Sequence, residues 1–260
     1  MMLHTSVYLT PNPRGVLAQK QRRWAVLMLH GFTSGPQSVT AWAQALAGAG
    51  ATVHVPLLSG HGTSVTDLAQ TDAGQWRRDV QQALDRLKAQ GFDRIAVAGL
   101  SMGGTLALDA ASHREVDAVF VVNPALSFRP VDQLGVFLSP LLKGVIPTVG
   151  PLAGDVKKPG TTEDAYERTP VAAVEQLARL FATVRRRLHT IEAPVRHYRS
   201  RVDHIVPDSS AKILRNGIAP DLLTTLVLER SFHVATLDFD AQTIQQDSVA
   251  TLRSLQERSA

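Results

Sequence analysis

The residues from Gly99 to Gly103, GLSMG, place a serine between two glycines. This spacing fits the pattern G-x-S-x-G, in which a sharp turn between a strand and a helix exposes a serine hydroxyl as a nucleophile. Glycine leaves room for the neighbouring backbone to approach such a turn closely. The apolar stretch RIAVAG ends at the first glycine, and GGTLALDAASH, with helical spacing, begins at the second. The motif therefore predicts Ser101 as a nucleophile.

A base must accept the proton of such a serine, because the neutral hydroxyl is a weak nucleophile. In hydrolases with this motif, an acid and then a histidine follow the serine along the chain. Four histidines lie beyond the helix that follows Ser101: His189, His197, His204 and His233. Only the last of them follows the final predicted strand, in ERSFHVATLD. We therefore predict His233 as the base.

The orienting acid is expected after the preceding strand, PVRHYRS, where SRVDHIVP supplies Asp203. Asp208 is expected instead to cap the following helix through its carboxylate, since free backbone N–H groups at a helix start favour such a side chain. Asp238 and Asp240 are expected beyond the loop that carries the base. Asn123 is excluded as the acid, because an amide does not stabilise an imidazolium as a carboxylate does. Asp203 remains as the predicted acid.

Acyl transfer also requires N–H donors that stabilise the negative oxygen of the tetrahedral intermediate. One donor is usually the residue after the nucleophile, here Met102, and the other lies in the loop after an early strand. That loop reads LHGFTSGP, so the N–H of Phe32 is the predicted second donor. His30 is expected to brace this loop rather than to act chemically.

The elements that must position these residues alternate along the chain. Six stretches are predicted as strands: 24–30, 51–56, 94–99, 117–123, 193–200 and 222–229. Helical patterns cover 36–50, 73–91, 105–113, 208–218 and 242–258, and a further helix is expected to end near the solvated run 185–187. This alternation predicts an α/β fold with a mostly parallel sheet and helices on both faces.

Residues 124–170 interrupt the alternation. The segment is rich in proline and glycine, contains apolar clusters and has no predicted strand. Insertions of this length are usually functional, such as a lid over a site. We therefore predict a core formed by residues 1–123 and 171–260 and a small cap formed by residues 124–170. An apolar cap near the carboxyl edge of a sheet is suited to an apolar substrate.

Composition excludes several other classes of protein. The chain has no cysteine, which rules out disulfides, thiolate metal sites and a cysteine nucleophile. Its net charge of +4 comes from dispersed basic residues, so no nucleic-acid partner is predicted. No His and carboxylate spacing such as H-E-x-x-H occurs, and no metal or cofactor is predicted. Without an apolar run of about 18 residues or a secretory pattern, we expect a cytoplasmic protein with at most transient contact to a lipid surface.

Six motifs resemble the bacterial monoacylglycerol lipases and related small carboxylesterases of the α/β-hydrolase superfamily: HGFTSGPQS, PLLSGHGT, GLSMGG, AYERTP, VDHIVP and SFHVATLD. The resemblance implies a serine esterase for monoglycerides or short- to medium-chain esters, with the triad and the oxyanion donors predicted above. It also implies an apolar acyl tunnel under the cap and a cap glutamate for the glycerol hydroxyls. By the surrounding TEDAYERTP, that glutamate matches Glu163, and Leu152 matches an apolar cap position.

One strand departs from the family pattern. PVRHYRSR replaces a continuous apolar run, and His197, Arg199 and Arg201 would share one face. That face must be solvated, paired with other side chains or near an interface.

Other functions remain open on the sequence. A general carboxylesterase without glycerol recognition is one, and a C–C bond hydrolase or perhydrolase that uses the same triad is another. A binding protein could also use the fold, but it would have little need to keep the triad together with both oxyanion loops. The sequence leaves the oligomeric state undetermined.

Overall fold

The centre of the protein is a mostly parallel sheet. The structure, a computed structural model, describes residues 5–18, 23–129 and 147–258. Its seven-stranded sheet has the order β1-β3-β2-β4-β5-β8-β9. The strands are β1 (Val7–Leu9), β2 (Trp24–Leu29), β3 (Thr52–Val55), β4 (Arg94–Leu100), β5 (Ala118–Val122), β8 (Val195–Ser200) and β9 (Leu223–Leu228). β1 runs antiparallel to β3, whereas every other neighbouring pair in this sheet is parallel. The predicted fold class is confirmed.

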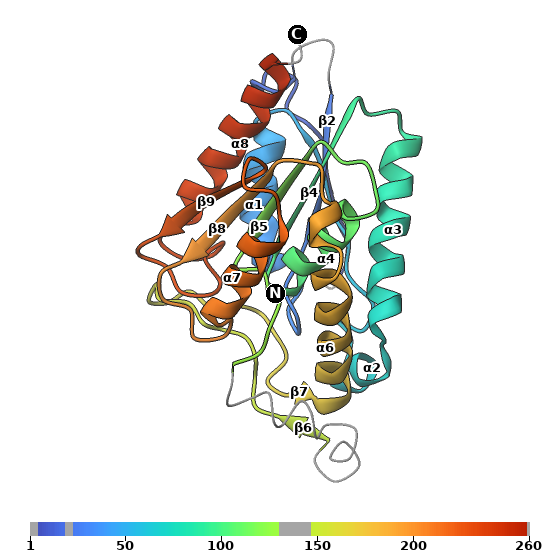
Figure 1. Cartoon of the computed structure of the whole chain (residues 1–260), viewed down its shortest axis with the longest axis vertical. Coiled ribbons are helices and arrows are strands. Elements are labelled where there is room, and N and C mark those ends of the chain that lie inside the picture. The colour runs from blue at the N-terminus through green and yellow to red at the C-terminus, as the bar shows by residue number, and fades with distance from the viewer. Residues whose placement is uncertain (1–4, 19–22, 130–146, 259–260) are drawn as a thin grey trace.

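Helices cover both faces of this sheet (Figure 1). α1 (Gln37–Gly48) and α8 (Ala241–Arg258) pack on one face, and α3 (Ala73–Ala89), α4 (Met102–Ala111) and α6 (Val171–Arg185) pack on the other. α2 (Val65–Gln70) and α7 (Asp208–Gly217) are shorter. Each face of the sheet has its own apolar core, and alternate residues of β4 belong to one or the other. Val97 lies in the core with α3 and α4, and Ala98 lies in the core with α1 and α8. Burial on both faces explains why this strand is apolar after Arg94.

The six predicted strands all lie in the sheet, with ends that differ by one or two residues. The prediction missed β1 and α2, because segments of three and six residues are too short for a periodic pattern. α6 ends at Arg185, and the exposed basic run begins there as expected.

The predicted cap is described in part, because residues 130–146 lie outside the described residues. Its described parts, 124–129 and 147–170, add no strand to the main sheet, as expected. They do contain a small antiparallel pair that was not predicted, β6 (Thr148–Val149) with β7 (Thr169–Pro170). This pair lies at the bottom of the view in Figure 1, near the N-terminal end of α6.

The polar residues of β8 have partners, which accounts for the departure from the family pattern. Arg199 pairs with Asp208 at 2.5 Å, and Arg201 pairs with Glu229. His197 is buried, and its Nδ1 contacts the hydroxyl of a threonine on β9 at 3.2 Å. Of the three possibilities left by the sequence, pairing is found for both arginines, and Arg201, directly after β8, is also solvated.

The expectation that Asp208 caps the following helix is wrong. α7 starts at Asp208 itself, Pro207 occupies the N-cap position, and no side chain caps the helix there. The carboxylate turns instead toward Arg199 on β8, because a guanidinium offers a charge-assisted hydrogen bond.

Candidate active site

Ser101 lies in a strained turn between β4 and α4. Its φ of 54° and ψ of −116° are rare for a residue with a side chain, and such strain is found mainly at functional sites. Hydrogen bonds hold the turn: the Ser101 N–H donates to the carbonyl of Val122, and the Ser101 carbonyl accepts from the N–H groups of Thr105 and Ala125. The serine of the predicted motif therefore occupies the expected strand–turn–helix junction.

The two glycines of the motif are required by close backbone contacts. A Cβ atom at Gly103 would lie 2.1 Å from the carbonyl oxygen of Leu29, and one at Gly99 would lie 2.3 Å from the backbone of Gly103. Neither approach is possible for a residue with a side chain. The turn therefore packs directly against the end of β2, where the predicted oxyanion loop begins.

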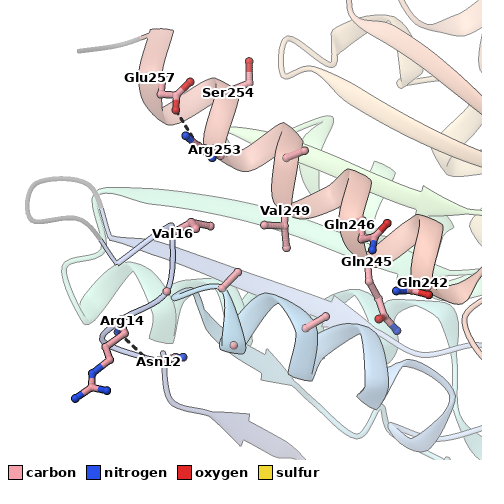
Figure 2. A pocket seen from close by; sticks show the side chains of 15 residues that line it. Asn12, Arg14, Val16, Gln242, Gln245, Gln246, Val249, Arg253, Ser254 and Glu257 are labelled. Atoms are coloured by element: carbon pink, nitrogen blue, oxygen red, sulfur yellow. Dashed lines mark hydrogen bonds and ion pairs between the residues drawn. The ribbon is translucent and has the colours of Figure 1, made fainter.

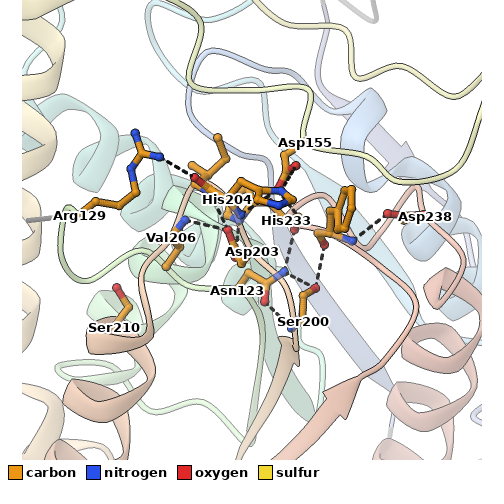
Figure 3. A network of polar contacts seen from close by, with 12 residues as sticks. Asn123, Arg129, Asp155, Ser200, Asp203, His204, Val206, Ser210, His233 and Asp238 are labelled. Carbon is orange, nitrogen blue, oxygen red and sulfur yellow. Dashed lines mark hydrogen bonds and ion pairs between the residues drawn. The ribbon is translucent and has the colours of Figure 1, made fainter. Parts of the chain in front are cut away.

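Asp203 and His233 form a hydrogen-bonded pair (Figure 3). The Nδ1 of His233 lies 2.8 Å from Oδ2 of Asp203, and both side chains are buried. The other oxygen, Oδ1, accepts hydrogen bonds from the N–H groups of Ile205 and Val206 at 2.9 and 2.7 Å. Asp203 follows β8 and His233 follows β9, so both lie at the carboxyl edge of the sheet, the edge at which ligands bind in open α/β folds.

Electrostatics favour an ionised acid beside a protonatable base. Burial raises the pKa of Asp203, but the charge and hydrogen bond of His233 and the two backbone N–H groups outweigh it, so that the pKa is lowered. Burial lowers the pKa of His233, but Asp203, followed by Glu163 and Asp155, outweighs it and raises the pKa above 6.5. The pair is therefore arranged to stabilise an imidazolium during a reaction.

These shifts predict how activity depends on pH. His233 must be neutral to accept a proton, so kcat/KM for an uncharged ester should rise with pH and reach half its maximum above 6.5, because the pKa is raised. A pH series with a nitrophenyl ester measures this midpoint. A midpoint below 6.5 would contradict the raised pKa.

Asn123 links the nucleophile turn to the base loop. Its Nδ2 donates to the carbonyl of His233 at 2.7 Å, and its side chain also binds the hydroxyl and the N–H of Ser200. Two residues later, Ala125 donates its N–H to the carbonyl of Ser101. The segment from Asn123, which the sequence excluded as the acid, to Ala125 therefore contacts both His233 and Ser101.

The predicted oxyanion donors lie beside the turn. Met102 is the first residue of α4, where backbone N–H groups lack partners within the helix, and Phe32 follows the end of β2. Among the residues that the structure describes, no group accepts a hydrogen bond from the backbone N–H of Met102 or of Phe32. A Cβ atom placed on Gly31 would lie 3.9 Å from the Cβ of Ser101. Both amides are therefore free at the nucleophile turn.

His30 braces the oxyanion loop. Its Nε2 accepts the N–H of Leu58 at 3.1 Å, so its Nδ1 carries the proton and donates to the carbonyl of Gly31 at 2.9 Å. Burial lowers the pKa of His30 to about 4, which keeps the ring neutral. Its contacts agree with the structural role expected from the sequence.

Glu163 and Leu152 are the two residues of the predicted cap for which the resemblance implies a role at this site. Oε1 of Glu163 lies 3.8 Å from the Cβ position built on Gly31, and Oε2 accepts the N–H of Gly154 at 2.8 Å. Burial raises the pKa of Glu163, against the opposing effects of Gly154, the Ser34 hydroxyl and the nearby base. Leu152 packs against the apolar cluster that contains both oxyanion residues. Glu163 therefore lies beside the oxyanion loop, and Leu152 belongs to the apolar core that the loop joins.

Three carboxylates at the site were not predicted. Asp155 contacts the loops of both Asp203 and His233. Asp238 and Asp240, expected beyond the base loop, fold back and accept backbone N–H groups from it, at 2.9 Å for Asp238 and 2.8 Å for Asp240. Asp238 ends the family motif SFHVATLD, although the motif assigned no contact to it, whereas Asp155 and Asp240 lie outside the quoted motifs.

Other features of the described residues lie apart from the predicted site. No group of three or more residues there could hold a metal ion. A groove of about 760 Å³ between α1, α8 and the segment from Asn12 to Val16 contains none of the predicted site residues (Figure 2). Within the ranges that the structure describes, no helix is long and apolar enough to cross a membrane.

Comparison with known proteins assigns the chain to a family. A model of the Hydrolase_4 family, serine aminopeptidase S33, matches residues 20–240. A thermostable monoacylglycerol lipase of Bacillus sp. (strain H-257) is 38% identical over 225 residues, which cover 86% of this chain and 88% of the lipase. A carboxylesterase of Bacillus subtilis (strain 168) is 28% identical over 235 residues, which cover 89% and 93% of the two chains.

A solved structure agrees with these relatives. A structure described with the metagenome-derived lipolytic enzymes LipS and LipT has a TM-score of 0.87 and 32% identity, and the match covers 98% of this chain and all of the other. The chain belongs to the Hydrolase_4 family and has the α/β-hydrolase fold.

Proposed function

We propose that the protein is a serine hydrolase that cleaves monoacylglycerols to a fatty acid and glycerol. The observation that carries this proposal is the buried Asp203–His233 pair at the sheet edge that also bears the strained Ser101. Glu163, a carboxylate beside the nucleophile turn, supports a polar head group in the substrate. The similarity to a monoacylglycerol lipase along most of the chain supports the same substrate class.

The proposed reaction has two steps. His233 holds Asp203 through Nδ1, which leaves Nε2 to accept the proton of Ser101 as its Oγ attacks the ester carbonyl. The N–H groups of Phe32 and Met102 stabilise the oxyanion. His233 then protonates the departing glycerol oxygen, and an acyl-enzyme ester remains on Ser101. His233 then takes a proton from water, whose oxygen attacks this ester, and as the acyl–Oγ bond breaks His233 returns that proton to Ser101 and the fatty acid leaves.

In this proposal, Glu163 accepts hydrogen bonds from the glycerol hydroxyls and Leu152 contacts the acyl chain. A site built to pair with hydroxyls discriminates against substrates that lack them, because its polar groups are then left unpaired. Glu163→Ala should therefore slow monoacylglycerol hydrolysis by roughly 1.5–3 kcal/mol, or about 10- to 150-fold in kcat/KM. A nitrophenyl ester of the same acyl chain should be cleaved at nearly the unchanged rate.

Glu167→Ala is the matched control, because Glu167 is an exposed carboxylate of the same segment. It should leave both rates unchanged. Equal losses on both ester types in Glu163→Ala would mean a damaged cap rather than a lost head-group contact. No loss on either substrate would leave Glu163 without a role in binding.

A general carboxylesterase is the second candidate, supported by the similarity to the carboxylesterase of Bacillus subtilis. Rates across monoacyl, diacyl and triacyl glycerols and simple alkyl esters separate the two candidates. A preference for monoacylglycerols supports the first, and comparable rates on alkyl esters support the second. The cytoplasmic location remains a prediction, which fractionation of expressing cells would test.

A further inference from the structure

A short strap of the predicted cap, residues Gly154 to Lys158, lies against the loops that carry Asp203 and His233 (Figure 3). The strap makes polar contacts along its whole length. Gly154 donates its N–H to Glu163, and the N–H groups of Lys157 and Lys158 donate to one buried carboxylate, Asp238. That carboxylate also accepts the N–H of Phe232, the residue before the base. The strap is therefore bound to the base loop.

Asp155, at the centre of the strap, binds both catalytic loops. Its Oδ2 accepts the N–H of His233 and the N–H of His204, each at 3.1 Å. Its Oδ1 lies 2.8 Å from Nδ1 of His204, and its backbone carbonyl accepts the N–H of Val234 at 3.0 Å. The carboxyl group is largely buried, with a side-chain exposure of 12%.

The two amides on Oδ2 belong to the base and to the immediate neighbour of the acid. Oδ2 of Asp155 thus binds both the acid loop and the base loop close to the point where Asp203 and His233 contact each other. The side chain of Asn123 donates a hydrogen bond to the carbonyl of His233, and the side chain of Asp155 accepts one from the N–H of His233. Both backbone polar groups of the base residue are therefore bound by side chains.

We propose that Asp155 is a positioning residue for the Asp203–His233 pair, because its carboxylate fixes the distance between the acid loop and the base loop. The inference rests on the triad of the proposed function. A displacement of about 1 Å in a catalytic group can cost on the order of 100-fold in rate, so a residue that sets this distance acts on turnover. Contacts with the substrate are not needed for this effect.

Asp155 also contributes charge to the base. The charged groups that raise the pKa of His233 are Asp203 from the acid loop and Glu163 and Asp155 from the cap, and burial opposes them. His204 is the titratable group that faces Asp155 itself. Loss of the Asp155 charge should therefore lower the pKa of His233 and move the pH midpoint of kcat/KM downward.

Two substitutions separate geometry from charge. Asp155→Ala removes both the spacing and the charge, and kcat should fall about 10- to 100-fold with KM changed by less than about twofold. Asp155→Asn keeps an oxygen that accepts the two N–H groups, and kcat should remain within about threefold of the original value. Both variants should show the lowered pH midpoint, whereas the control Glu167→Ala should show neither change.

Rates are normalised by titration of active sites with a phosphonate and are measured on a monoacylglycerol and on a nitrophenyl ester of the same acyl chain. Equal losses on both esters are expected. A loss confined to the monoacylglycerol would assign Asp155 to the head-group site through Gly154 and Glu163, and would overturn the inference. An unchanged kcat per titrated site in Asp155→Ala would overturn it as well.

Three outcomes keep this test distinct from other failures. If Asp155→Ala does not fold, Asp155→Glu decides, because its longer side chain keeps the charge but changes the spacing, and a kcat per titrated site equal to that of the original protein contradicts the inference. If Ser101→Ala is inactive but both Asp155 variants behave like the original protein, the triad holds and only the role of Asp155 is wrong. Activity that persists in Ser101→Ala would refute the proposed function itself.

Discussion

Ser101→Ala is expected to abolish ester hydrolysis, with a fall in kcat of about 10⁴- to 10⁶-fold. The acyl-enzyme forms through Oγ of this serine, and no cysteine is present to replace it. The fold should persist, because the hydrogen bonds of the turn use the backbone of Ser101 rather than its hydroxyl. Rates on a nitrophenyl ester and a thermal unfolding curve measure the two effects.

Covalent labelling gives an independent check on the nucleophile. An organophosphonate should modify Ser101 and leave Ser34, Ser59 and Ser231 unmodified, as mass spectrometry of peptides would show. Labelling at one of these three serines, or substantial activity in Ser101→Ala, would exclude the predicted nucleophile.

Asp203→Asn should lower kcat by about 10⁴-fold. An asparagine still accepts the N–H groups of Ile205 and Val206 through Oδ1, so the acid loop should keep its shape. The amide cannot stabilise the imidazolium of His233 as a carboxylate does. Loss of this charge should also move the pH midpoint of kcat/KM downward, because Asp203 is the main group that raises the pKa of His233.

Asp208→Asn is the matched control for this substitution. Asp208 is an exposed aspartate near the same loop, and it pairs with Arg199 rather than with the base. The kcat and the pH midpoint of kcat/KM of Asp208→Asn should equal those of the original protein within experimental error. Unchanged values in Asp203→Asn would mean that another group orients His233.

The nucleophile turn and the parallel sheet were predictable from the sequence because both depend on local constraints. Backbone atoms within about 2.3 Å of a Cβ position force glycine at Gly99 and Gly103, and this requirement appears directly as a pattern. Strands buried on both faces appear as apolar runs, and helices between them appear as periodic ones. The order of acid and base along the chain then reduced the candidates to Asp203 and His233.

Contacts between distant segments could not be predicted in the same way. Arg199 pairs with Asp208 and Arg196 pairs with Asp247, so polar residues on β8 lie in a buried sheet without breaking it. The wrong prediction of a helix cap at Asp208 has this origin, because a local preference lost to a nearby guanidinium. No local rule states which carboxylate an arginine will meet.

The side chains that bind the backbone of His233 could not be predicted from the sequence either. Asn123 is 110 positions from His233, and Asp155 is 78 positions from it, yet each binds one backbone group of that residue. A single asparagine or aspartate has no period and no neighbouring motif that would reveal such a contact. These contacts arise when folding brings Asn123 and Asp155 to the edge of the sheet where His233 lies, since a hydrogen bond requires about 3 Å in space and does not depend on separation along the chain.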